Sequence, residues 1–286
     1  SKGSPQMTPI MAMLLAVGVA AATTSYWDPT TASMPLTVSE LGFGVGNVTE
    51  NTVAAFEKGI ALGASGVEMT ARLTADGYIA LIHNAHASNG KLVSATNFSD
   101  LPKGTVELAT AIKVVGAKGY GMNIMLQNNA LEPGYDKSQR VAKVAVERVL
   151  AAGIADLVLI SAFNVDTVIA AKDACAGCGI HTAWLIASMF NPFKTSAQFI
   201  DAAVDAGLDA LNPEAGLIDR AMIEGARAKG LRLFPWFYGG KLDPEAPERL
   251  QQLSDCGIDG LIVAQVKRAI ASRTAKQPKS GAACEK

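Results

Sequence analysis

The chain has 286 residues, of which 49% are hydrophobic and 18% are charged, and its formal net charge at pH 7 is −1. The charged fraction lies below the usual quarter, and the chain lacks the basic surplus of nucleic-acid-binding proteins, so we expect no nucleic-acid partner. This length suits one barrel domain or two small domains.

The first segment, residues 1–27, is apolar. It carries no charge between Lys2 and Asp28, and its apolar stretch approaches the about 20 residues that span a bilayer. We therefore expect residues 7–27 to meet a lipid bilayer, with Tyr26 and Trp27 at the membrane interface. Two alternatives stay open: a cleaved signal ending near residues 20–22, or an arm packed on a partner protein.

The rest of the chain predicts a linker at 28–37, one α/β barrel at 38–270 and a flexible tail at 271–286. Strand patterns alternate with amphipathic helices, and glycines recur at the helix ends, which is typical of βα units. The expected strands are residues 38–43, 65–69, 78–82, 122–127, 157–161, 181–187, 208–212, 231–237 and 260–264.

The stretch from residue 49 to residue 86 carries the most specific pattern. Asn51 or Thr52 can cap a helix, Glu68 lies in a short strand, and His83 follows the apolar strand 78–82. That strand is of the kind buried on both faces. Polar residues at strand ends are how an α/β barrel builds a site on its upper face.

This stretch resembles the glycerophosphodiester phosphodiesterase family. The motifs that carry the resemblance, in the family's order, are Glu50-Asn51-Thr52, Glu68-Met69-Thr70, Thr74-Ala75-Asp76-Gly77 and His83-Asn84. The resemblance implies a TIM (β/α)8 barrel and metal-assisted hydrolysis of phosphodiesters, with calcium or magnesium, two acid/base histidines and several carboxylate ligands.

The chain departs from the family pattern at several positions. The family's His-Arg-Gly falls on Leu41-Gly42-Phe43, its second strand carboxylate on Thr70, its Glu-x-Lys on Met125-Leu126-Gln127, and its Thr-Asp on Ala264-Gln265. Glu68 alone supplies too few oxygen ligands to hold a divalent cation. His83 alone cannot act both as the general base and as the general acid of hydrolysis. We therefore expect no catalytic residues and no cofactor, with Glu68 and His83 as remnants in an apolar barrel mouth.

Three further residues are candidates for the substrate pocket: Glu50, His86 and Trp236. For His83 we favour a polar strand end hydrogen-bonded by its neighbours over a surviving acid/base. His86 is expected in a solvated loop, with a substitute role in the site as the alternative. Glu68 either binds a cation weakly or pairs with a basic side chain.

The function favoured by these departures is a catalytically inactive, phosphodiesterase-like barrel that serves as an accessory subunit of a membrane protein complex. One alternative is a calcium- or magnesium-dependent hydrolase with a site rebuilt from Glu68, His83 and His86. The other is a module that binds a phosphate or lipid head without cleaving it. The expected location is an organellar or bacterial energy-converting membrane, with a secreted or periplasmic protein as the alternative.

Four cysteines leave the redox compartment open. Cys175 and Cys178 end a helix, and no second pair completes a zinc site. We interpret them as small residues at a helix end, with a local disulfide as the alternative.

Overall fold

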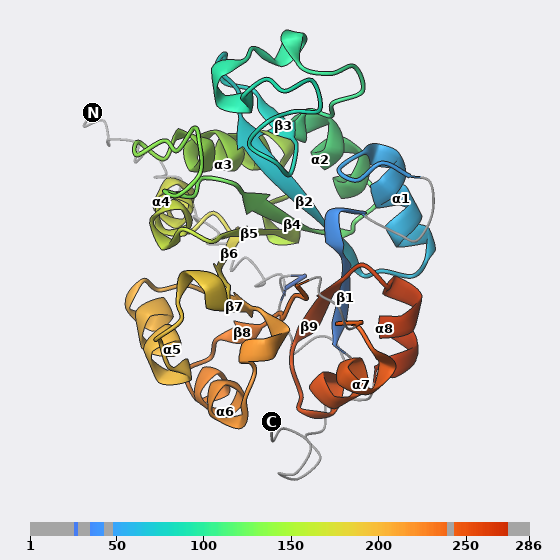
Figure 1. The fold of residues 1–286 in the computed structure, drawn as a ribbon, viewed down its shortest axis with the longest axis vertical. Coiled ribbons are helices and arrows are strands. Elements are labelled where there is room, and N and C mark those ends of the chain that lie inside the picture. Colours follow the sequence, from blue (N-terminus) through green and yellow to red (C-terminus); the bar gives the residue numbers. More distant parts are fainter. Residues whose placement is uncertain (1–25, 28–34, 43–47, 239–242, 274–286) are drawn as a thin grey trace, which may run out of the picture.

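Eight parallel strands form a nearly closed barrel. The structure is a computed structural model and describes residues 26–27, 35–42, 48–238 and 243–273. The strands follow the order β8-β7-β6-β5-β4-β2-β1-β9, and a parallel bridge between Trp236 and Ile262 joins the two ends. Figure 1 shows the helices arranged around these central strands. The TIM barrel expected from the sequence is therefore confirmed.

The elements lie close to their expected positions. The strands are β1 Leu36–Ser39, β2 Gly66–Leu73, β3 Ile79–Leu81, β4 Gly121–Leu126, β5 Val158–Ala162, β6 His181–Ile186, β7 Ala210–Pro213, β8 Arg232–Leu233 and β9 Gly260–Val263. The helices are α1 Val53–Ala61, α2 Leu108–Gly116, α3 Arg140–Ala152, α4 Val165–Cys175, α5 Ser196–Asp205, α6 Arg220–Ala228, α7 Pro247–Asp255 and α8 Val266–Ser272.

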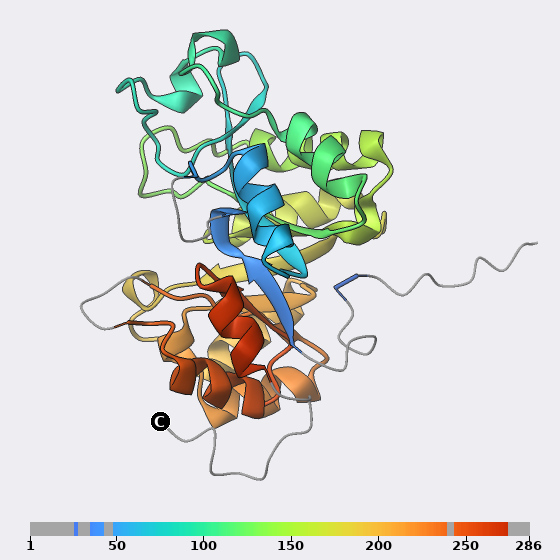
Figure 2. The same cartoon turned by 90° about the vertical axis from the view of Figure 1, so that its right-hand side faces the viewer.

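Strand β3 is not a barrel strand. It pairs antiparallel with β2, with Ala71 opposite Leu81, and lies off the path of the eight parallel strands. In both views the β2–β3 hairpin and the loops after it project beyond the ring of helices (Figures 1 and 2). An apolar run in the sequence predicts a buried strand but not whether it pairs parallel or antiparallel with its neighbour. That depends on the connection, because a short turn joins antiparallel strands and a long crossover joins parallel ones.

The lower end of the barrel, where the strands begin, is filled by residues that precede β1. Trp27 is fully buried among inward-facing side chains of the strands, and its ring meets Phe234 edge-on with the centroids 5.4 Å apart. Its indole nitrogen donates to the carbonyl of Leu157 over 2.9 Å. The Tyr26 hydroxyl donates to the carbonyl of Ser65, and its ring occupies the space that a side chain on Gly121 would need.

This packing corrects one expectation. The sequence predicts Tyr26 and Trp27 at a membrane interface, but they pack at the lower end of the barrel, because side chains must fill the interior of an eight-stranded barrel. The barrel also starts at Leu36 rather than residue 38, and α8 ends at Ser272. The apolar residues 7–25 and the tail from 274 onward lie outside the described residues. Within the described part of the chain, no helix combines the length and apolarity needed to cross a membrane.

A disulfide joins Cys175 and Cys178 at the end of α4, with the Cα atoms 5.1 Å apart. The interpretation of these cysteines as unpaired small residues is therefore wrong. Ala176 adopts a left-handed conformation with φ of 47°, which turns the chain so that the two side chains meet.

We expect Trp27→Ala to lower the free energy of unfolding by about 3–5 kcal/mol, because it empties the barrel floor and removes a buried hydrogen bond. Urea denaturation followed by fluorescence measures this change. Phe193→Ala is the matched control: Phe193 is 93% exposed, so its removal should change stability by less than about 0.5 kcal/mol. Equal effects of the two substitutions would contradict this account of the floor.

Candidate functional site

A polar layer lies inside the barrel above the apolar floor. Side chains alternate along a strand, so residues two positions beyond the floor residues Val38, Leu159, Ala210 and Phe234 also face inward. These upper positions hold mostly polar or aromatic side chains: Glu40, Ser161, Asn212 and Trp236. The expectation of an apolar barrel mouth is therefore wrong for the interior, although Met125 is buried there as expected.

Glu68 of β2 is the centre of this layer. It is 4% exposed, and its Oε2 accepts a 2.7 Å hydrogen bond from the amide of Asn123 on β4. The Oδ1 of Asn123 in turn accepts a 2.8 Å bond from the hydroxyl of Ser161 on β5. Burial raises the pKa of Glu68 to about 8, and the neighbouring charge of Glu40 adds to the shift. Glu68 is thus largely protonated at neutral pH, and its partner is an amide rather than a basic side chain.

A second acidic group stands at the carboxyl end of β1. Burial raises the pKa of Glu40 to about 7, helped by the charges of Glu245 and Glu50. Glu245 precedes α7 and accepts backbone hydrogen bonds from Ala264 and Gln265 at 2.8 and 2.7 Å. Its pKa is also raised, chiefly by burial. Glu40 after β1, Glu68 in β2 and Glu245 before α7 therefore lie near enough for their charges to interact at the barrel mouth.

Sequence reasoning missed Glu40. Counting back from Glu50 pointed to Leu41 as the strand-end position, but β1 ends at Ser39 and Glu40 follows it directly. Leu41 and Gly42 form the turn, both with positive φ, and a Cβ on Gly42 would lie 2.7 Å from the backbone nitrogen of Phe56. The signal that could have found Glu40 is a lone charge immediately after an apolar strand.

A cavity of about 570 Å³ brings together three of the predicted residues. Glu50, His83 and His86 line it with Asn51, Asn84 and Lys103. Both histidines are exposed, as is Glu50. Glu68 does not line this cavity, because its side chain points into the barrel interior. Trp236 does not line it either, and it belongs to the opposite side of the mouth.

Asn51 gives this cavity a fixed wall. Its φ of 57° is left-handed, a conformation that asparagine tolerates well. Its Oδ1 accepts a 2.9 Å bond from the backbone nitrogen of Thr70, which ties the start of α1 to β2. Its Nδ2 is buried without a hydrogen-bond partner among the described residues, and Asn51 as a residue lines the cavity. Thr52 is the residue that caps α1, with its hydroxyl accepting from Ala55 over 3.2 Å.

Arg72 holds His83 in position from behind. Its Nε and Nη2 donate to the carbonyl of His83 over 3.0 and 2.8 Å, and Nη2 pairs with Glu132 at 2.7 Å. Arg72 therefore holds the backbone carbonyl of His83, and the exposed imidazole side chain lines the cavity.

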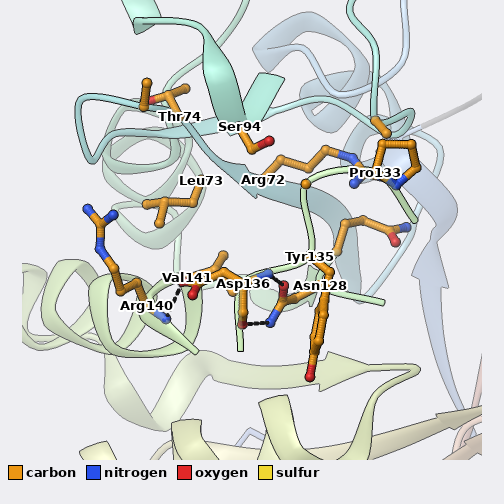
Figure 3. A pocket seen from close by; sticks show the side chains of 14 residues that line it. Arg72, Leu73, Thr74, Ser94, Asn128, Pro133, Tyr135, Asp136, Arg140 and Val141 are labelled. Atoms are coloured by element: carbon orange, nitrogen blue, oxygen red, sulfur yellow. Dashed lines mark hydrogen bonds between the residues drawn. The ribbon is translucent and has the colours of Figure 1, made fainter. Parts of the chain in front are cut away.

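A smaller cavity of about 400 Å³ lies on the other side of Arg72, where β2 ends and α3 begins. Figure 3 shows Asp136 bonded to Asn128 at this cavity. The Asp136 carboxylate also accepts from the backbone nitrogen of Arg140 over 3.0 Å and thereby satisfies the start of α3. Polar groups of this cavity hydrogen-bond to one another, so we interpret them as stabilising the packing of β2 against α3 rather than as binding a ligand.

Trp236, which follows β8 and bridges to Ile262 of β9, anchors a row of aromatic side chains at the barrel mouth. Its ring contacts Phe163 and Tyr238 edge-on, with centroids 5.7 and 6.3 Å apart, and Phe163 contacts Phe190 at 5.3 Å. The indole nitrogen donates to the carbonyl of Ile186 over 3.3 Å, which fixes the ring.

The divalent cation implied by the resemblance does not fit these residues. Among the described residues, no three His, Cys, Asp or Glu side chains are arranged to hold a metal ion. Glu68 is bonded to Asn123 inside the barrel, whereas Glu50 lines the outer cavity. Met125 offers only a thioether, which is a poor ligand for calcium or magnesium.

Comparison with known proteins points to one family. Residues 43–268 match the family model described as "Glycerophosphoryl diester phosphodiesterase family". A glycerophosphodiester phosphodiesterase of Caldanaerobacter subterraneus is 25% identical over 243 residues, covering 76% of this chain and 88% of that protein.

Solved structures share the fold at low identity. A phosphodiesterase of Oleispira antarctica, in complex with sn-glycerol-3-phosphate, has a TM-score of 0.67 and 18% identity, covering 84% of this chain and 96% of that one. A glycerophosphodiester phosphodiesterase of Thermotoga maritima has a TM-score of 0.63 and 19% identity, covering 83% and 97%. One from Parabacteroides distasonis has a TM-score of 0.68 and 16% identity, covering 83% and 95%.

Glu68→Gln should make the stability less dependent on pH. Since the folded pKa of Glu68 is raised, the native state holds a proton that the unfolded state releases between about pH 4.5 and 8, so native stability falls as pH rises through this window. Glutamine keeps the bond to Asn123 without this penalty. We expect Glu68→Gln to stabilise the protein at pH 8 by on the order of 3 kcal/mol and to change little at pH 4.

Urea denaturation at both pH values measures this difference. Glu57→Gln is the control, because Glu57 is an exposed partner of Lys118 and should show no such pH dependence. A Glu68→Gln variant that is less stable than the parent at pH 8 would show that the ionised carboxylate is the native form.

Proposed function

The chain belongs to the glycerophosphoryl diester phosphodiesterase family, and we propose that it binds the phosphate of a phosphodiester in the Glu50–His83–His86 cavity without cleaving it by a metal-assisted route. The observation that carries this proposal is the convergence of hydrogen-bond donors on one cavity. His83, His86 and Lys103 come from two loops, and Asn51 presents an amide whose Nδ2 has no partner.

These donors suit a phosphate group. Charged nitrogen donors make the strongest hydrogen bonds to phosphate oxygens, and a buried unpartnered amide gains most from a ligand acceptor. Glu50 on the same wall accepts from a hydroxyl of the ligand, as the glycerol half of a glycerophosphodiester would offer. The Oleispira antarctica relative was solved with sn-glycerol-3-phosphate, which supports a ligand of this class.

The proposal of binding without metal-assisted cleavage rests on where the carboxyl groups lie. Cation binding needs several oxygen ligands around one point. Here Glu68 is held inside the barrel by Asn123, and Glu50 faces the outer cavity.

A second candidate function is hydrolysis without the family's metal geometry. The observation that favours it is that His83 and His86 line the same cavity. One imidazole can take the proton of water while the other gives a proton to the leaving alcohol. This candidate differs from the rebuilt hydrolase expected as an alternative from the sequence, because it uses His83 and His86 without Glu68 and without a cation.

The role as an accessory subunit of a membrane complex remains a prediction from the sequence. The disulfide between Cys175 and Cys178 supports an oxidising compartment, because such bonds are rare in reducing ones. We therefore favour the secreted or periplasmic location that the sequence left open as the alternative.

Binding of glycerophosphoglycerol, a phosphodiester with two uncharged alcohols, tests the proposal. We expect saturable binding by calorimetry with no added metal, weakened at least about tenfold by His83→Ala and by Lys103→Ala because each removes a nitrogen donor to the phosphate. Lys118→Ala is the control, since this exposed lysine only pairs with Glu57. Absence of binding by the folded parent protein would refute the proposed function.

A hydrolysis assay separates the two candidates. With calcium, magnesium or a chelator, we expect no release of glycerol phosphate. Release that persists with chelator and disappears in both His83→Ala and His86→Ala would establish the histidine-pair hydrolase. Release that requires the cation would overturn our conclusion about the metal.

A further inference from the structure

The loops that follow β3 contain a modification motif that neither the barrel nor the phosphodiester cavity uses. Residues 97–99 are Asn97-Phe98-Ser99. An asparagine with serine or threonine two positions later accepts an N-linked glycan when the residue between them is not proline. We propose that Asn97 is a glycosylation site and that its side-chain amide takes an N-linked oligosaccharide.

Asn97 lies on the surface of the segment that projects from the barrel. Asn97 and Ser99 are both exposed. Asn97 precedes the short helix Phe98–Asp100, but its side chain makes no capping hydrogen bond to that helix. In Figures 1 and 2 the loops after β3 lie beyond the ring of helices. The amide therefore has no part in ending or starting this helix, and a bulky group attached to it extends into solvent.

The backbone around Asn97 is fixed by its neighbours. The amide nitrogen of Phe98 donates to the two carboxylate oxygens of Asp76 over 3.0 and 3.2 Å. The amide nitrogen of Asp100 donates to the carbonyl of Asn97 over 3.0 Å. The half-buried ring of Phe98 packs against Tyr78, with the centroids 5.7 Å apart. The middle residue of the motif thus anchors the loop, while the residues that supply the amide and the hydroxyl stay exposed.

The cysteines give an independent indication of the compartment that this modification requires. Cys175 and Cys178 form a disulfide, Cys256 is also disulfide-bonded, and no described cysteine is a free thiol. Disulfides persist in the secretory pathway and outside cells, and N-linked glycans belong to secreted proteins. Glycosylation of Asn97 therefore rests on the secreted location favoured above. It does not rest on the phosphodiester cavity, which Asn97 does not line.

The transfer joins the Nδ2 atom of Asn97 to the anomeric carbon of an oligosaccharide carried on a lipid diphosphate. The new N–C bond forms as the bond between that carbon and the diphosphate oxygen breaks. The lipid diphosphate leaves with the electron pair, and the amide gives up a proton to a base of the transferase. The motif assigns to Ser99 the hydroxyl that marks Asn97 as the acceptor.

A second motif of this kind must be kept apart from the first. Asn47-Val48-Thr49 has the same pattern, and its asparagine lies outside the described residues. An Asn47→Gln background removes that acceptor, so that any remaining N-linked glycan reports on the rest of the chain.

Expression of the full chain in this background, directed to the secretory pathway of a eukaryotic cell, tests the proposal. We expect mass spectrometry to find a glycan on the peptide that contains Asn97, and peptide N-glycosidase to remove it and increase the electrophoretic mobility. Asn97→Gln and Ser99→Ala should each abolish the modification, because they remove the acceptor amide and the hydroxyl of the motif. Chain recovered from both the medium and the cells is measured.

Asn89 provides the matched control. It is another exposed asparagine in the loops after β3, but Lys91 stands two positions after it, so Asn89→Gln should leave the glycan unchanged. Lys91→Ser completes a motif at Asn89 and shows whether the transferase reaches these loops. An unmodified Asn97 in the parent chain overturns the proposal, and glycosylation of Asn89 in Lys91→Ser would show that the failure is specific to Asn97. A glycan on Asn97 that persists in Ser99→Ala also overturns it.

Discussion

The burial of Trp27 in the lower end of the barrel is the contact on which the rest of the site depends. A barrel of eight strands has an interior just wide enough for side chains, and this chain fills its lower half with Trp27, Phe234 and small aliphatic residues. With apolar area concentrated there, the layer above can hold polar groups without leaving the barrel empty. The residues just before β1 thereby act as part of the core, although they precede the barrel in sequence.

The polar layer above this apolar floor contains a buried hydrogen-bonded network. Glu68, Asn123 and Ser161 form a hydrogen-bonded chain across three neighbouring strands, and the carboxyl at its end keeps its proton because the site is dry. Burial of Glu68 thus favours its neutral form as long as no cation lies beside it.

Position on the fold, more than residue type, separates the candidate residues into two groups. Glu50, His83 and His86 belong to loops on the hairpin side and meet at an outer cavity. Glu68 lies in β2, Glu40 and Trp236 follow β1 and β8, and all three face the interior. The side chain of Asn212, also in the interior, has no hydrogen-bond partner among the described residues. A fold shared with many hydrolases does not by itself assign the reaction, and the separation of the carboxylates is what distinguishes this chain's chemistry.

The order of motifs along the chain was sufficient to predict the TIM barrel, most element positions, and the grouping of Glu50 with His83. Element positions can be predicted from the sequence because strand periodicity, helix caps and glycines at helix ends depend on residues close together in the chain. Contacts between distant residues were inaccessible to such patterns. The direction of β3, the entry of Trp27 into the core and the position of Glu40 depend on how the barrel closes, and that closure is set by packing of the whole chain. The Cys175–Cys178 bond depends instead on a local left-handed turn at Ala176, which residue type alone does not predict.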